Sequence, residues 1–428
     1  MRVIDSRDKG FRSVLSSITG RGAQDTVRVE PVVKAILDDV KRRGDRAVVE
    51  YTERFDGVDI KGALEVGGKE IDRAFKAIPR KDLALIELAA SRIESFHKKQ
   101  LRNSWFTVEG NGSILGTKIT PLERAGIYVP GGKAAYPSTV LMNAIPARVA
   151  GVDTVVMATP PGKDGINPYA LASARVAGVD RVFRTGGAQA VGALAFGTET
   201  IPKVDKITGP GNIYVATGKR LVFGTVDIDM VAGPSEILII NDGTGEPSWV
   251  AADLLSQAEH DELASSILIT TSKEMAARVS SEIVRQLGKL KRRAIASASI
   301  KEYGAIIIAR DLKEAVEISN GIAPEHLELF VERPFELLGL VRNAGAVFLG
   351  RNTPEAAGDY LAGPNHTLPT GGTARFSSPL GVDDFIKKTS VIGFSAEAIA
   401  SLGGDIKRFA EIEGLDAHAE SVKKRLRG

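Results

Sequence analysis

Histidine is scarce in this sequence, and four of its five histidines stand beside acidic, amide or turn residues. These four are His260, His326, His366 and His418. Such neighbours suit a polar site better than a hydrophobic core, whereas His97 ends a helical pattern and is typical of a structural or solvated residue. A surface position explains any one of the four equally well. Together they indicate chemistry.

Gln257 and His260 lie three residues apart, late in a segment with the periodicity of an amphipathic helix. Ser248, which follows a proline, is its candidate N-cap. Residues three apart share a helix face, so an amide oxygen and an imidazole can converge on one point. That point could be a metal ion. A solvated helix end explains this segment alone more simply.

Nitrogen and oxygen ligands that suit zinc are available, and the absence of cysteine excludes a thiolate site. The candidate ligands are Gln257, His260, Asp359 and His418. They are scattered along the chain and do not form a known zinc-binding motif. The set is therefore weak as a motif.

Glu325 and His326 form the best acid–base pair in the sequence. They stand side by side at the start of a predicted strand. Adjacent residues of a strand point to different sides, so we expect them to serve different protons. A solvated loop before a buried strand is an equally good interpretation.

Glycine-rich turns follow three predicted strands or precede predicted helices, at 184–189, 208–212 and 232–236. Open α/β sheets bind ligands at the carboxyl ends of their strands, and a helix N-terminus can receive a phosphate. None of the turns matches a standard dinucleotide or P-loop fingerprint. A nucleotide is possible here, and a plain tight turn is the default interpretation.

The composition is that of an ordinary globular protein of 428 residues, large enough for two or three domains. Lys and Arg number 56 and Asp and Glu 53, so the charge balance indicates neither nucleic acid nor an anionic membrane as a partner. The sequence has no apolar signal region and no run of membrane-spanning length. With no cysteine, these features favour a cytoplasmic protein.

Hydrophobic periodicity predicts a mainly helical first quarter and then alternating strands and helices from residue 126 onward. This alternation predicts an α/β fold with parallel sheets, built from two modules rather than one very large sheet. Strands are expected at 105–108, 114–119, 154–158, 181–184, 205–208, 237–240, 266–269, 305–308, 327–330 and 346–349. The Pro/Gly-rich loop at 352–379 is long enough to indicate a functional role. From about residue 395 we expect a helix followed by a polar tail.

Several of these stretches, taken together, resemble the histidinol dehydrogenase family. The matching stretches are 126–132, 186–190, 208–212, 232–236, 257–261, 323–327, 357–360, 363–366 and 413–418. They occur in the family's order and cover nearly the whole chain. Glu262 and Ala158 depart from residues common in the family, but neither coincides with an implied site residue.

The resemblance implies oxidation of L-histidinol through L-histidinaldehyde to L-histidine with two NAD+. It implies one Zn2+ per subunit, held by Gln257, His260, Asp359 and His418. Substrate would also contact Ser235, His326, His366 and Glu413. NAD would contact Tyr128, Gln189 and Asn212. Glu325 and His326 match the family's catalytic pair.

The implied fold consists of two incomplete Rossmann-like modules with parallel sheets, similar to the aldehyde-dehydrogenase-like architecture. One module would comprise 26–125 and 236–380 and carry the metal and catalytic residues. The other would comprise 126–235 and bind NAD. An N-terminal arm, 1–25, would pack with 381–405. The tail, 406–428, would cross to the partner of a homodimer, so that His418 and Glu413 serve the partner's site.

The residues support this chemistry independently. Oxidation of an alcohol needs a base for the hydroxyl proton, which suits His326, and oxidation of an aldehyde needs a thiol adduct or a hydrate. Without cysteine, Glu325 activating water is the consistent assignment. A metal-dependent hydrolase and a non-catalytic nucleotide-binding protein are the competing interpretations.

Overall fold

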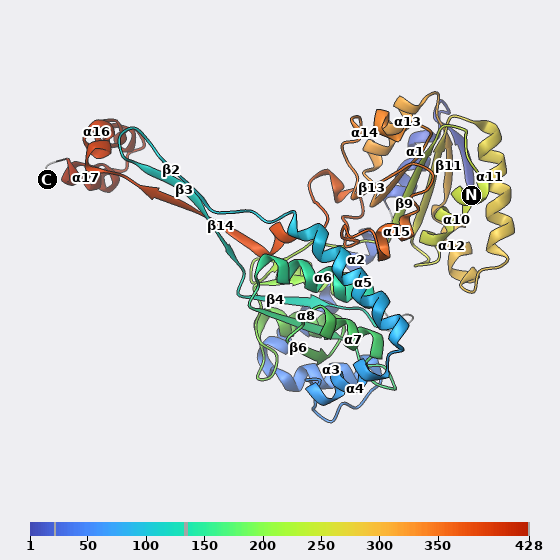
Figure 1. Ribbon diagram of the computed structural model, residues 1–428, viewed down its shortest axis with the longest axis horizontal. Helices are drawn as coiled ribbons and strands as arrows, with labels where there is room; N and C mark the ends of the chain where they lie inside the picture. Colours follow the sequence, from blue (N-terminus) through green and yellow to red (C-terminus); the bar gives the residue numbers. More distant parts are fainter. Residues whose placement is uncertain (21–22, 132–135, 427–428) are drawn as a thin grey trace.

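The computed structural model describes the chain except for residues 21–22, 132–135 and 427–428 and the side chains of 23–26. Gly132, part of one family-like stretch, therefore lies outside the described residues. Figure 1 shows two α/β modules side by side and a long arm that leaves them and carries the C-terminus. No described helix has both the length and the apolar character needed to cross a bilayer.

The first module is built on a six-stranded sheet whose strands all pair in parallel. Its order is β1 (Arg2–Asp5), β11 (Ala305–Ile308), β10 (Ser265–Thr270), β9 (Glu236–Asn241), β12 (His326–Phe330) and β13 (Ala346–Leu349). Alternate side chains point to opposite faces, so Ile237 and Ile239 join one core and Leu238 and Ile240 the other. Both faces must therefore be covered.

Helices cover both faces of this sheet. One core contains residues of α10 (Pro247–Ala258), α11 (Lys273–Leu287) and α12 (Arg293–Tyr303). The other contains residues of α1 (Phe11–Thr19), α13 (Leu312–Ile322) and α14 (Pro334–Leu338). The nearly continuous apolar strands, such as Ile237 to Ile240, follow from this burial on two sides.

The second module is built on a five-stranded parallel sheet. Its order is β6 (Arg181–Arg184), β5 (Thr154–Thr159), β4 (Arg124–Tyr128), β7 (Lys206–Thr208) and β8 (Asp227–Ile228). The helices in its first core are α2 (Ala23–Arg43), α3 (Asp45–Asp56), α8 (Gly187–Phe196) and α9 (Ile213–Val222). Those in its second core are α4 (Gly68–Ala77), α5 (Arg80–Lys98), α6 (Pro137–Ala150) and α7 (Pro168–Val176).

The arm is a three-stranded antiparallel sheet with two helices at its tip (Figure 1). The strands are β2 (Trp105–Val108), β3 (Ile114–Pro121) and β14 (Ile386–Gly393), and the helices are α16 (Ala396–Ile412) and α17 (Asp416–Arg425). The helix start expected near residue 395 is confirmed, since Ser395 caps α16 by accepting from the amide of Ala398. The expected polar tail is wrong in part, because α17 makes most of it helical.

Two expected groupings of the chain differ from the structure. The helices between residues 27 and 98 cover the five-stranded sheet and not the six-stranded one, because the apolar faces of α2 to α5 complete the two cores of the five-stranded sheet. The C-terminal part of α5 also contacts the 236–380 segment, where Arg92 donates to the carbonyl of Leu361. Among the described residues of the expected N-terminal arm, β1 and α1 pack on the six-stranded sheet and not on the 381–405 segment. Strand β1 lies at the edge beside β11, with Val3 opposite Ile306. The α/β class with parallel sheets is confirmed.

Candidate active site

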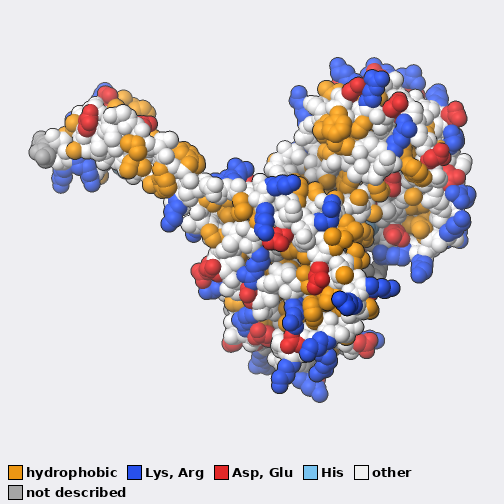
Figure 2. Space-filling model, viewed as in Figure 1, with side chains coloured by type: hydrophobic (Ala, Val, Ile, Leu, Met, Phe, Trp, Pro, Cys, Tyr) orange, Lys and Arg blue, Asp and Glu red, His pale blue; other side chains and the backbone are white. Residues whose placement is uncertain are grey.

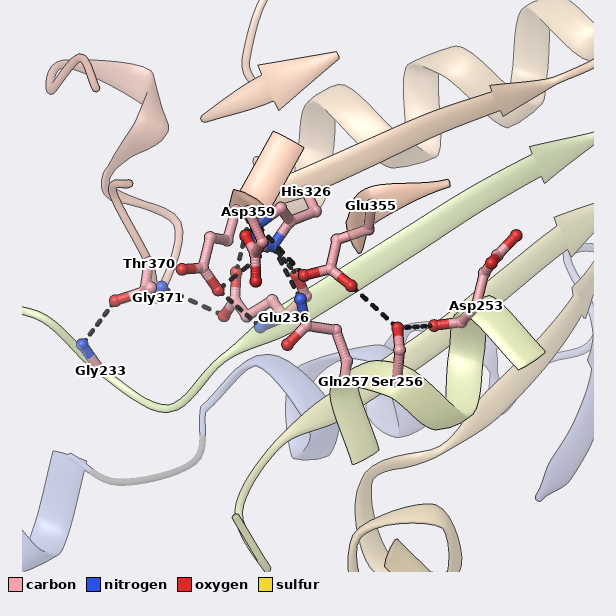
Figure 3. Close-up of polar contacts among 11 residues, drawn as sticks. Gly233, Glu236, Asp253, Ser256, Gln257, His326, Glu355, Asp359, Thr370 and Gly371 are labelled. Carbon is pink, nitrogen blue, oxygen red and sulfur yellow. Dashed lines mark hydrogen bonds and ion pairs between the residues drawn. The ribbon is translucent and has the colours of Figure 1, made fainter. Parts of the chain in front are cut away.

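A cluster of polar side chains meets at the amino ends of β9 and β12 in the six-stranded sheet (Figure 3). His326 is the first residue of β12 and is paired in register with Ile237 of β9, and Glu236, one position earlier, is the first residue of β9. Gln257 lies near the end of α10, whose C-terminus returns to this edge of the sheet. The three side chains are all buried. The glycine-rich turns were expected to bind ligands at the carboxyl ends of strands. This cluster lies instead at the amino ends of its strands.

The loop from 352 to 379 contributes two carboxylates to the cluster, in agreement with its expected functional role. It contains a short helix, α15 (Glu355–Tyr360), on which Glu355 and Asp359 are four residues apart and share one face. The backbone amide of Glu355 donates to Glu328 Oε1 at 2.9 Å, which fixes the start of this helix over β12. Sequence reasoning missed Glu355, although its i, i+4 spacing to Asp359 was a readable signal.

The ring of His326 is held in one orientation. Its Nδ1 lies 2.9 Å from the backbone oxygen of Glu236 and 3.1 Å from the side-chain nitrogen of Gln257, so the ring is bounded by both on this side. When Nδ1 carries the hydrogen, it donates to the Glu236 oxygen. In a neutral ring the lone pair is then on Nε2. Nε2 is buried without a hydrogen-bond partner among the described residues and lies 3.9 Å from both Glu355 Oε1 and Asp359 Oδ1. This is the geometry of a base aimed into a site.

Glu325 lies beside His326 rather than on the opposite side. Its Oε2 accepts from the backbone amide of Glu236 at 2.8 Å and lies 3.6 Å from His326 Nδ1. The prediction that the two residues point apart is wrong, because Glu325 precedes β12 and does not follow the alternation of the strand. The two side chains still face different surroundings. Glu325 lies on the Nδ1 side of the His326 ring, whereas Nε2 lies near the carboxylates of α15.

The charges around His326 are strongly unbalanced. Burial lowers the pKa of its imidazole, but the negative charges of Glu325, Glu355 and Asp359 outweigh this and raise the pKa to about 10. Burial and the nearby Glu355 raise the pKa of Asp359 to about 8. Behind them, burial and Asp253 raise the pKa of Glu328 well above its usual range. The negative charges of these buried carboxylates exceed the positive charge of the side chains around them, so a bound cation would stabilise the ionised carboxylates.

This excess of negative charge fits a divalent cation. His260, Glu355 and Asp359 each offer a ligand atom, and these atoms all lie within 4.8 Å of one another. The side-chain oxygen of Gln257 is buried and has no partner among the described residues. Imidazole, amide and carboxylate donors are a set that zinc accepts. His260 is exposed, because α10 ends at Ala258 and the turn carries His260 beyond it.

Two further expectations about this helix are corrected. Gln257 and His260 do not share a face of α10, since only Gln257 belongs to the helix, although both reach the same cluster. Ser248 does not cap the helix. The N-cap position is Glu246, and it makes no side-chain cap hydrogen bond, because the helix begins at Pro247, whose missing amide needs no partner.

Ser235 and His366 lie on loops that border the cluster. Ser235 directly precedes Glu236 and is partly buried. His366 is partly buried, with its Nε2 unpartnered among the described residues, and burial lowers the pKa of its ring to about 4. It is therefore neutral at pH 7 and offers a hydrogen-bonding atom to a ligand.

Glu413 and His418 are not brought to the cluster within one chain. Glu413 caps the end of α16 and His418 lies on α17, both exposed at the tip of the arm far from the two modules (Figure 1). A site containing them would need the arm of another copy.

The three candidate cofactor residues lie at the carboxyl edge of the five-stranded sheet. Tyr128 ends β4, and its hydroxyl accepts from the amide of Gly187 at 3.1 Å. Gln189 lies in the first turn of α8, buried, with neither amide atom partnered among the described residues. Asn212 is the N-cap of α9 and accepts from the amides of Tyr214 and Val215. Asn212 thus has a structural task in addition to any contact with a ligand.

A buried ion pair fixes the turn between β7 and α9. Lys219 and Asp229 are bonded to each other with almost no exposure. Lys219 Nζ also donates to the carbonyl of Gly209 at 2.9 Å, and Asp229 Oδ2 accepts from the Gly209 amide at 2.8 Å. Gly209 has φ +110°, and a Cβ there would lie 2.1 Å from the Tyr128 carbonyl oxygen. The pair therefore anchors the glycine turn directly beside Tyr128.

The chain is thus an α/β protein with two parallel-sheet modules and a buried histidine–carboxylate cluster at the amino edge of one sheet. A family model described as histidinol dehydrogenase matches residues 19–426. The chain belongs to the histidinol dehydrogenase family. It is an NAD-dependent oxidoreductase of histidine biosynthesis.

Similar proteins match along their full length. Histidinol dehydrogenase of Syntrophotalea carbinolica is 58% identical over 428 residues, covering 100% of this chain and 99% of the relative. That of Geobacter metallireducens is 59% identical over 430 residues, with the same coverage. The crystal structure of histidinol dehydrogenase from Elizabethkingia anophelis has a TM-score of 0.94 at 38% identity and covers 100% of this chain and 98% of that one.

Proposed function

We propose that this chain oxidises L-histidinol through L-histidinaldehyde to L-histidine, transferring hydride to two NAD+ in succession. The observation that carries the proposal is the buried ring of His326, whose Nε2 has no hydrogen-bond partner among the described residues and lies 3.9 Å from two carboxylates of α15. The remaining assignments follow from what each step requires of the surrounding side chains.

In the first oxidation, the carbinol carbon gives a hydride to NAD+ and the hydroxyl gives its proton to His326 Nε2. The hydrogen bond from Nδ1 to Glu236 keeps the acceptor nitrogen aimed at the substrate. This arrangement is that of general-base catalysis, which contributes about 10²–10⁴ in rate. Substrate would also contact Ser235, His366 and Glu413 of the partner subunit.

In the second oxidation, water adds to the aldehyde carbon to form a hydrate: Glu325 accepts one proton of that water, and the carbonyl oxygen takes the proton that His326 received in the first oxidation. The hydrate then gives its hydride to the second NAD+ while a neighbouring base takes the proton of the hydroxyl. The chain has no cysteine for a thiohemiacetal, so the hydrate route balances without a thiol. The short distance between the two catalytic side chains supports handling both steps in one place.

Zinc would be held by Gln257, His260, Asp359 and His418 of the partner subunit. When bound, it would anchor the imidazole and amino nitrogens of the substrate and so supply orientation. Glu355, whose Oε1 has no hydrogen-bond partner among the described residues, borders the same point and adds negative charge to it. Two features support zinc at this point: the imidazole, amide and carboxylate donors, and the excess of negative charge among the buried carboxylates.

NAD would bind at the carboxyl edge of the five-stranded sheet, in contact with Tyr128, Gln189 and Asn212. The unpartnered amide of Gln189 supports a ligand there, because a buried amide without a partner is costly. The N-terminus of α9 at Asn212 favours an anionic group such as a pyrophosphate.

We propose that the protein is a homodimer in which the arm crosses to the partner. Its apolar side chains support this, since many are exposed within the single chain, and Figure 2 shows orange patches along it. They include Trp105, Phe106, Val108, Ile114, Ile392, Phe394, Phe409 and Ile412. An exposed apolar surface of this extent indicates an interface.

The direct test is an assay of the purified chain with histidinol, NAD+ and zinc, following the appearance of NADH. We expect two NADH per histidinol, and loss of the activity with a chelator followed by recovery with zinc. Absence of NADH under these conditions would contradict the proposed function, and activity indifferent to the chelator would contradict the zinc assignment.

A further inference from the structure

Asp56 is the last residue of α3 and carries a partly buried carboxylate close to the cofactor edge. One turn earlier, the hydroxyl of Thr52 is hydrogen-bonded to that of Thr185 at 3.1 Å. Thr185 directly follows β6 and precedes the glycine turn at Gly186 and Gly187. This bond attaches the end of α3 to the edge where the candidate cofactor residues lie.

The carboxylate of Asp56 is placed unfavourably for stability. Its Oδ2 is buried and has no hydrogen-bond partner among the described residues. A negative charge at the C-terminal end of a helix also opposes the helix dipole. Asp45, at the favourable N-terminal end of the same helix, is by contrast hydrogen-bonded to Thr200. Nothing in the described structure compensates Asp56, and such groups are characteristic of ligand sites.

Asp56 is also near Tyr128. Burial raises the pKa of the Tyr128 hydroxyl to about 12, and the negative charge of Asp56 adds to the rise. Burial likewise raises the pKa of Asp56 to about 6, which leaves the group mainly ionised at pH 7. The hydroxyl of Tyr128 accepts from Gly187, and the bond between Thr52 and Thr185 attaches the end of α3, which carries Asp56, to the segment that leads into the same turn. The unpartnered amide of Gln189 belongs to the helix that begins there.

We propose that Asp56 accepts hydrogen bonds from the hydroxyls of the adenosine ribose of NAD and is the residue that selects NAD over NADP. An ionised carboxylate only accepts, and the vicinal hydroxyls of a ribose are donors, so the two are complementary. A 2′-phosphate would replace one donor by a dianion and be repelled by the same carboxylate. The inference rests on the proposed NAD site and deepens it.

The test is calorimetric titration of the wild-type enzyme and of Asp56→Asn with NAD and with NADP. Asparagine keeps the shape and removes the charge. We expect NAD affinity to fall about tenfold and the preference for NAD over NADP to fall at least tenfold, as for loss of a charged hydrogen bond. Glu53→Gln is the matched control, because Glu53 is exposed on the same helix, and its affinities should stay within about twofold.

Steady-state kinetics should agree with the titrations: KM for NAD rises in Asp56→Asn, while KM for histidinol is unchanged. Thermal unfolding monitors the fold, and the variant should melt no lower than wild type, since it loses an unpaired buried charge. Equal weakening of NAD and NADP, or no change in either, would overturn the proposal. A wild type that binds NAD without oxidising histidinol would refute the proposed function, while the titrations would still test Asp56.

Discussion

The imidazole of His326 must be neutral to accept a proton, yet the carboxylates beside it favour its protonated form. In the metal-free chain their charges raise its pKa to about 10. A cation among Glu355, Asp359 and His260 would offset these charges and allow the neutral ring at physiological pH. The several carboxylates thus suit a metal site. Without a cation they would keep His326 protonated and unable to accept a proton.

Replacing His326 by Asn should lower kcat for histidinol oxidation by about 10²–10⁴, the usual contribution of a general base. Asparagine preserves the hydrogen bond to Glu236 but offers no proton acceptor. The measurement is steady-state NADH formation together with zinc content, which should stay at the wild-type level. Near-normal kcat in a zinc-loaded variant would remove His326 from the proton transfer.

Glu325→Gln separates the two oxidations. With histidinol as substrate it should still form the first NADH, while turnover of histidinaldehyde falls by about 10²–10⁴ because the water lacks its base. Single-turnover measurements starting from each substrate make the comparison. Equal losses from both substrates would contradict the assignment of Glu325 to the aldehyde step.

His97 offers a pH test outside the site. Burial lowers the pKa of its ring from 6.5 to about 4, so below pH 6.5 the unfolded chain binds a proton that the folded chain refuses. Stability is therefore lost as pH falls from 6.5 towards 4, by about 3 kcal/mol. Urea unfolding at several pH values should show a smaller loss for His97→Gln over this range. An unchanged pH profile would exclude His97 as a contributor.

Among individual residues, the sequence indicated the site well where residue type alone is distinctive. His260 and Asp359 offer ligand atoms within 4.8 Å of each other, Gln257 lies 3.1 Å from His326 Nδ1, and Glu325 lies 3.6 Å from the same nitrogen, while their roles remain predictions. Glu236 and Glu355 were not singled out, because acidic residues are common and only the fold brings these two beside His326. His97 was ambiguous from sequence, since its burial depends on the packing of α5.

At the scale of elements, periodicity predicted ten of the fourteen strands in the described part of the chain, and it missed β1, β4, β8 and β14. Most of the predicted strands are buried on one or two faces, which makes their pattern strong. Periodicity did not predict α15 or α17. The first is a short helix in a loop rich in Pro and Gly, and the second is largely polar, so neither has a clear apolar stripe. Periodicity also locates helix ends poorly, so it did not show that α10 ends at Ala258, before His260.

The turn between β7 and α9 gives a test at this scale. Lys219→Met would leave Asp229 buried without its partner and the Gly209 carbonyl without its donor, lowering the free energy of unfolding by about 3–5 kcal/mol. Arg220→Met is the matched control, since its ion pair with Glu30 is exposed and its loss should cost less than about 1 kcal/mol.

Urea unfolding of both variants measures the difference, and Lys219→Met/Asp229→Asn should recover part of the loss because it removes the unpaired charge. Equal stability of the Lys219 and Arg220 variants would mean that the buried pair does not hold the turn.

For the whole molecule, the number and type of modules were predictable, but their membership was not. Apolar helical patterns do not specify which sheet they cover, so α2 to α5 were placed with the wrong sheet. The partner assignment of the arm came from a family resemblance. The exposed tip that carries Glu413 and His418 is consistent with it.

Subunit mixing tests the crossing. His260→Ala and His418→Ala chains should each be nearly inactive, yet a heterodimer of the two would contain one intact site, with about half the activity of a wild-type dimer. Tagged chains allow the heterodimer to be purified before the assay. A verified heterodimer that stays inactive would mean that each site is built within one chain.

The proposed acid–base cluster lies at the amino edge of one sheet, whereas the proposed cofactor turns lie at the carboxyl edge of the other. Substrate and nicotinamide would therefore be held by different modules of the same chain. A spent cofactor could then leave and a fresh one enter while the half-oxidised aldehyde stays attached to its own module. With substrate and cofactor held by separate modules, the reactive aldehyde would stay bound while NADH is replaced by NAD+.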